Sequence, residues 1–150
     1  MTRRFTARTA GIEVPDIGEI PPYWVRVVVH DTDQEMRRSY AKHSGESIRN
    51  VADVGGGFTH AVKAGHNGYL GILRFSAESL PIEFVVHESI HVAVFLAQTY
   101  FGSNPLRLPT GGKGTREEVI AYVGGSLAEA LIEKLIPGVP PREMLWPQEA

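Results

Sequence analysis

A 14-residue apolar stretch that holds two histidines and a glutamate constrains this chain more than any other feature. Residues 84–97 are apolar apart from four polar positions: His87, Glu88, Ser89 and His91. The length and composition of this stretch predict the middle of a long buried helix, running from Ser79 or Leu80 to about Phe101. Polar groups inside a buried helix carry a large desolvation cost unless they find partners. The fold must therefore supply partners for this cluster.

The spacing of the cluster matches the pattern H-E-x-x-H. Two histidines four residues apart lie on one face of a helix, so both imidazoles can reach one ion. Glu88 follows the first histidine and can reach a water held by that ion, whose pKa zinc lowers to about 7. The motif thus predicts zinc bound by His87 and His91, with Glu88 as the general base. The alternative is a helix whose His and Glu side chains lie on a solvated stripe or pair with other side chains.

The composition limits the third ligand. The 150 residues include no cysteine and six histidines, so the ligand has to be another His, Asp or Glu. A last helix is predicted from Thr115 to about Leu135, and the loop before it allows this helix to fold back antiparallel to the first. We favour Glu118 in its first turn, with Glu117 as the competing candidate. Alternatively, Glu118 only closes a capping box with Thr115.

One face of that last helix carries small residues that would let another backbone approach closely: Ala121, Gly124, Gly125 and Ala128. This face supports a close antiparallel pair of helices.

The rest of the chain reads as one α+β domain. Its predicted elements are a strand at Trp24–His30, a helix from a capping box at Thr32 and Glu35 to about His43 with Gly45 ending it, a loop over residues 50–57, and a hairpin of residues 58–63 and 68–75. We expect residues 1–22 to form an irregular arm, residues 23–135 the domain, and residues 136–150 a proline-rich tail.

At these residues the chain resembles a known family. His87, Glu88 and His91 on one helix, followed by Glu118, Ala121 and Tyr122 on the next, are similar to the small zincin-like metallopeptidases of phage and prophage genomes, minimal relatives of the gluzincins. The order of elements over residues 24–135 is also similar. The resemblance implies a small sheet of three or four strands packed on the HExxH helix and a second C-terminal helix.

For the site, the resemblance implies one Zn²⁺ per chain, with His87, His91 and Glu118 as ligands and Glu88 as the base. It selects Glu118 over Glu117. Tyr122 stands where larger gluzincins have an aspartate, which implies that its hydroxyl either orients a ligand or assists the oxyanion.

The expected function is therefore a zinc metallopeptidase acting on a peptide or protein. The alternative is a non-catalytic zinc-binding module that keeps the fold, and a third reading is an interaction domain without metal. Tyr122, Tyr100 and His60 are candidate oxyanion donors. By the resemblance, the edge of the hairpin would bind an extended peptide.

The charge balance and the missing targeting signals set expectations for partners and location. The net charge of −2 and the absence of clustered Lys and Arg with interleaved aromatics disfavour nucleic acid as a partner. No signal peptide or membrane span is recognisable, so we expect a soluble cytoplasmic protein without a membrane partner. The sequence does not indicate an oligomeric state.

Overall fold

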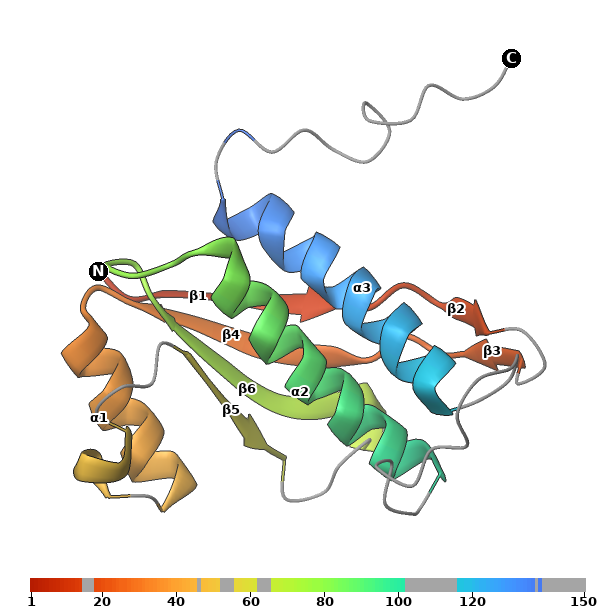
Figure 1. Cartoon of the computed structure of the whole chain (residues 1–150), viewed down its shortest axis with the longest axis horizontal. Helices are drawn as coiled ribbons and strands as arrows, with labels where there is room; N and C mark the ends of the chain where they lie inside the picture. The colour runs from red at the N-terminus through yellow and green to blue at the C-terminus, as the bar shows by residue number, and fades with distance from the viewer. Residues whose placement is uncertain are drawn as a thin grey trace.

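In the described part of the chain, a four-stranded mixed sheet and three α-helices form the main body of the fold (Figure 1). The computed structural model describes residues 1–14, 18–45, 47–51, 56–61, 66–101, 116–136 and 138. The sheet order is β1 (Arg3–Arg8), β4 (Trp24–His30), β6 (Tyr69–Ser76) and β5 (Gly56–His60). β4 and β6 are parallel, and the two outer strands run antiparallel to their neighbours. The predicted α+β class is confirmed.

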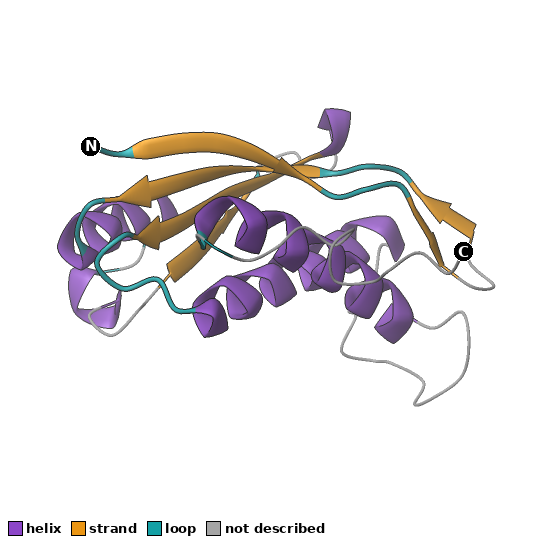
Figure 2. Cartoon of the chain, turned by 90° about the horizontal axis from the view of Figure 1, so that it is seen from above, coloured by secondary structure: helices purple, strands orange, loops and turns teal. Residues whose placement is uncertain are grey.

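Two long helices cover one face of the sheet (Figure 2). α2 (Ile82–Phe101) and α3 (Arg116–Leu135) lie side by side and run in opposite directions. Apolar side chains from both helices and from alternate strand positions form one core, which includes Val27, Leu73, Phe75, Val92, Leu96, Val123 and Leu127. α2 begins later than predicted, because the Pro81 carbonyl accepts the first helical N–H bonds, from Phe84 and Val85.

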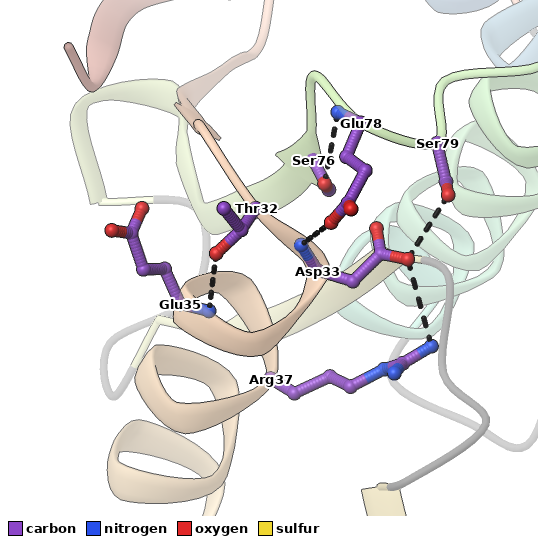
Figure 3. A network of polar contacts seen from close by, with 7 residues as sticks. All are labelled: Thr32, Asp33, Glu35, Arg37, Ser76, Glu78 and Ser79. Carbon is purple, nitrogen blue, oxygen red and sulfur yellow. Dashed lines mark hydrogen bonds and ion pairs between the residues drawn. The ribbon is translucent and has the colours of Figure 1, made fainter.

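α1 (Asp33–Ser44) has the bounds that its capping residues predict. Thr32 Oγ1 accepts a hydrogen bond from the Glu35 N–H at 3.2 Å, and Gly45 ends the helix in the left-handed region at φ 78°. The loop before α2 adds further contacts at this end: Glu78 Oε2 accepts from the Asp33 N–H, and Ser79 donates to the Asp33 carboxylate (Figure 3). The start of α1 is thereby tied to the chain that leads into α2.

The N-terminal segment corrects our expectation of an irregular arm. β1 is an edge strand of the main sheet, and β2 (Ile12–Val14) and β3 (Gly18–Ile20) form a small antiparallel pair. Phe5 and Ala7 pack against the core, while exposed arginines alternate with them. Edge strands tolerate such charged positions. The arginines leave few apolar residues in this segment, so its alternating apolar pattern was too weak to predict a strand.

The glycine-rich segment also differs from prediction. Gly56 and Gly57 belong to β5 rather than to a loop, and a 3₁₀ helix spans Ile48–Val51. The predicted antiparallel pairing of the two hairpin strands is confirmed, with Phe58 opposite Leu73; residues 62–65 of the predicted hairpin lie outside the described part of the chain. The predicted loop at 103–114, the cap at Thr115 and most of the tail lie outside the described residues. None of the helices in the described ranges is both long and apolar enough to cross a membrane.

Candidate metal centre

The two histidines of the motif face one another on α2. Their Nε2 atoms lie 3.1 Å apart, and the ring planes meet at 73°. Two imidazoles that share a tetrahedral zinc, each about 2.0–2.1 Å from it, have nitrogens roughly 3.3 Å apart. Both side chains are exposed. The two nitrogens therefore have a spacing that suits one shared ion, and solvent can reach both. In the structure, one ring donates a hydrogen bond to the other.

Glu88 and Ser89 carry the buried polar groups of the motif. Ser89 Oγ donates to the Val85 carbonyl at 2.7 Å, so it is satisfied within α2. Glu88 is only 6% exposed, and burial raises the pKa of its carboxyl to about 7. Its side chain lies against Gly56 of β5: a β-carbon added there would be 3.1 Å from Glu88 Cγ and 3.4 Å from Oε1. The glycine leaves the space that the carboxylate occupies.

A cavity of about 330 Å³ joins these groups at the β5 edge of the sheet. Its lining consists of Tyr40, Gly56, Gly57, Phe58, His60, His87, Glu88 and His91. Gly56 faces Glu88 of α2, whereas Gly57 faces Tyr40 of α1, so the two helices approach opposite faces of β5. A β-carbon at Gly57 would lie 2.4 Å from Tyr40 Cδ2. Glycine at both positions is thus what lets side chains from both sides reach this edge.

His60 lines the same cavity as the histidine pair. Its ring stacks on Phe95 of α2 with centroids 4.0 Å apart and planes at 16°. Burial lowers the pKa of His60; the pKa of His91 is lowered by burial and then by the charges of His87 and His60. The structure therefore brings this candidate oxyanion donor into the cavity of the pair. Tyr40 was missed by sequence reasoning, since its position depends on how α1 packs over Gly57.

The third ligand stays a prediction. Among the side chains that the structure describes, no group of three His, Asp or Glu residues is arranged to hold a metal. The side chains of Glu117 and Glu118 lie outside that described part. The predicted role of either residue is therefore neither confirmed nor contradicted by a contact.

The register of α2 and α3 sets a condition on that prediction. A β-carbon at Gly124 would lie 3.5 Å from Ala93 Cβ, so these two residues are level in the antiparallel pair. Glu118 precedes Gly124 by six residues and His91 precedes Ala93 by two, which separates Glu118 and His91 by about 12 Å along the axes. This separation is just over two helical turns of about 5.4 Å each. Ligation by Glu118 therefore requires the start of α3 to lie nearer His91 than this register places it.

The small-residue face of α3 is only partly used in this packing. Gly124 and Ala128 are buried and Gly124 meets α2, whereas Ala121 and Gly125 are exposed.

Tyr122 is not brought to the histidine pair. It is 44% exposed and lines another cavity, of about 520 Å³, together with residues 10–13. Val119 and Val123 occupy the core-facing side of α3, which leaves Tyr122 on an outward stripe. This placement does not support the predicted catalytic role of Tyr122. The Tyr100 side chain lies outside the described residues.

The other histidines are apart from the cavity. His30 is buried at the end of β4, and its Nε2 has no hydrogen-bond partner among the described residues. Burial, and then the charge of Arg74, lower its pKa. His43 is exposed in the last turn of α1, where Nδ1 contacts the Ser39 carbonyl at 2.7 Å. His66 begins a short 3₁₀ helix.

No family model matches this chain, and neither a curated protein nor a solved structure shows significant similarity to it. The resemblance to zincin-like peptidases therefore depends on the motif residues alone.

Proposed function

We propose that this protein is a zinc-dependent hydrolase that cleaves peptide bonds, with one zinc per chain bound by His87 and His91. The observation that carries the proposal is the 3.1 Å separation of the two Nε2 atoms, beside a buried glutamate, at the wall of a cavity. Glu118 is the third ligand that the family resemblance implies, under the condition on the α2–α3 register given above.

The chain's own residues support each remaining task. A bound zinc would act as a Lewis acid toward water and the substrate carbonyl. Glu88, held against Gly56, is placed to take a proton from the attacking water and return it to the leaving amine. His60, held by its stack on Phe95, faces the cavity and can donate a hydrogen bond to the oxygen on which charge develops.

The sheet edge offers a place for the substrate backbone. Within the described residues β5 pairs only with β6, so its other edge has no strand partner. An extended peptide can add to such an edge through main-chain hydrogen bonds. β5 also carries Gly56 and His60, so a peptide bound there would pass directly by the proposed catalytic groups.

The test begins with metal content. Elemental analysis of the purified chain should give one zinc, retained in His43→Ala and lost in His91→Ala; His43 is the matched control because it is an exposed histidine of α1 away from the cavity. Glu88→Gln should keep the zinc and abolish cleavage of a quenched fluorescent peptide mixture. Absence of zinc from the wild-type chain, or full cleavage by the Glu88→Gln variant, would refute the proposal.

A non-catalytic zinc-binding module is the second candidate. The observation in its favour is that Tyr122 lies at another cavity, away from the histidine pair. Bound zinc without turnover of peptides or of casein would select this alternative. Whether the protein is a hydrolase or a non-catalytic module, comparing the zinc affinities of Glu117→Gln and Glu118→Gln then identifies the third ligand.

A further inference from the structure

Part of the outer sheet face carries no α-helix in the described part of the chain; the short 3₁₀ helix His66–Gly68 lies at one end of it, beside Trp24. α2 and α3 cover the opposite face, and α1 packs over β5, β6 and one end of β4. The strand register shows which side chains share the uncovered part: Thr6 is opposite Arg26, Arg8 is opposite Trp24, and Trp24 is opposite Tyr69. These pairings gather residues from three distant segments onto one surface, which we call the open face: Arg4, Arg8, Trp24, Arg26 and Tyr69.

The open face is basic. β1, β4 and β6 contain no Asp or Glu. Arg4, Arg8 and Arg26 are all exposed, and the ion pairs found among the described residues include none of them. At about 3.3 Å per residue, Arg4 and Arg8 are roughly 13 Å apart along β1, with Arg26 on the neighbouring strand between them. Three cations are thus grouped within a span that several nucleotides would cover.

The acidic neighbours lie at the margins of this surface. Glu129 and Glu133 of α3 share a cavity wall with Arg8 around the edge of β1. At the other end of β4, Asp31 and Glu35 act electrostatically on His30, as does Arg4. Of the three arginines, Arg26 lies in the middle of the open face. By the strand register, it is the arginine farthest from the carboxylates at both ends.

The open face also carries an aromatic pair. The rings of Trp24 and Tyr69 lie 4.4 Å apart at 33°, and both side chains are half-buried. Trp24 Nε1 donates to the Asn67 carbonyl at 2.9 Å, which orients the indole. The pair therefore presents an ordered aromatic surface beside the arginines.

We propose that the open face binds single-stranded nucleic acid, with the arginines on phosphates and the Trp24–Tyr69 pair as a platform for bases. Aromatic side chains on a sheet surface stack with unpaired bases, and neighbouring cations follow the backbone. Unpaired bases use both features, whereas an anionic membrane or an acidic peptide would need only the charge. The net charge of −2 for the whole chain conceals this local grouping. The proposal does not depend on the hydrolase activity.

The test is fluorescence anisotropy of a labelled ten-nucleotide oligo-dT or oligo-U with the full chain, in EDTA so that metal plays no part. We expect a log–log salt slope near −2, because each of three phosphate contacts contributes about 0.7 on single strands. Arg26→Ala should weaken binding about tenfold and reduce the slope by about 0.7. Arg49→Ala, an exposed arginine of the 3₁₀ helix beside α1, is the matched control and should change neither.

The aromatic platform has its own test. Tyr69→Phe keeps the ring and should bind like wild type, whereas Tyr69→Leu should lose about tenfold in affinity; circular dichroism verifies that both variants are folded. Equal binding by wild type and Arg26→Ala would overturn the proposal. So would binding to phosphatidylserine vesicles or to polyglutamate that equals or exceeds binding to the oligonucleotides.

Discussion

Gly57→Ala tests the wall between α1 and the cavity. The added β-carbon would lie 2.4, 2.7 and 2.9 Å from three ring atoms of Tyr40, all closer than real β-carbons approach other atoms. The Tyr40 ring would have to move, and overpacking of this kind costs about 1–3 kcal/mol. Alanine offsets about 0.5 kcal/mol of this by reducing the entropy of the unfolded chain. We therefore expect a net loss of about 0.5–2.5 kcal/mol, or a fall in Tm of roughly 1–10 °C for a chain of this size.

The matched control is Gly125→Ala. Gly125 lies in α3, and no atom is within 4 Å of the position a β-carbon would take. Alanine favours helix over glycine by up to about 1 kcal/mol, so the Tm of this variant should rise slightly. Differential scanning calorimetry of both variants measures the contrast. If Gly57→Ala is as stable as wild type, Tyr40 does not pack against β5 as described, and the cavity wall is wrong.

Three further changes test other parts of the structure. Thr32→Ala removes the hydroxyl that accepts the Glu35 N–H, and should lower the free energy of unfolding by about 1 kcal/mol in a urea titration; an unchanged midpoint would show that this cap contributes nothing. Because the pKa of His30 is lowered below 6.5 by burial and by Arg74, its protonation opposes folding, so stability present above pH 6.5 is lost as the pH falls through that value. His30→Gln should reduce this loss in urea titrations between pH 5 and 7, and an identical pH dependence would contradict the assignment. On the proposed hydrolase, His60→Ala should keep its zinc but cleave the peptide mixture about 100-fold more slowly; unaltered cleavage would remove His60 from the mechanism.

Elements with local signals were predictable from the sequence. The helix α1 has a threonine cap at one end and Gly45 at the other, and both act on backbone groups within a few residues of themselves. β4 is a run of β-branched residues, and its predicted bounds are confirmed. β1 was missed because an edge strand needs only one apolar side, and Phe5 and Ala7 alone supply it.

In the candidate site, too, only the features with a local signal were predictable from the sequence. Helix geometry alone brings His87 and His91 together, so their four-residue spacing predicted the 3.1 Å approach of their nitrogens. The contacts of Glu88 with Gly56, and of Tyr40 with Gly57, depend on which faces of β5 the helices pack against. The glycines in the sequence indicate that space is needed at this part of β5, but they do not indicate which side chains fill that space.

The third ligand shows why spacing in sequence is a weak guide between helices. The 14 residues between α2 and α3 are enough to allow several antiparallel registers, so the number of residues between His91 and Glu118 does not determine their separation. The register is shown instead by the contact of Ala93 with Gly124, where a β-carbon on Gly124 would lie 3.5 Å from Ala93 Cβ, an ordinary van der Waals distance. A shift of α3 by two turns would bring Glu118 level with His91, but it would also move Gly124 away from Ala93. Ligation by Glu118 and this helix contact therefore compete, and zinc binding that is unchanged in Glu118→Gln would favour the contact.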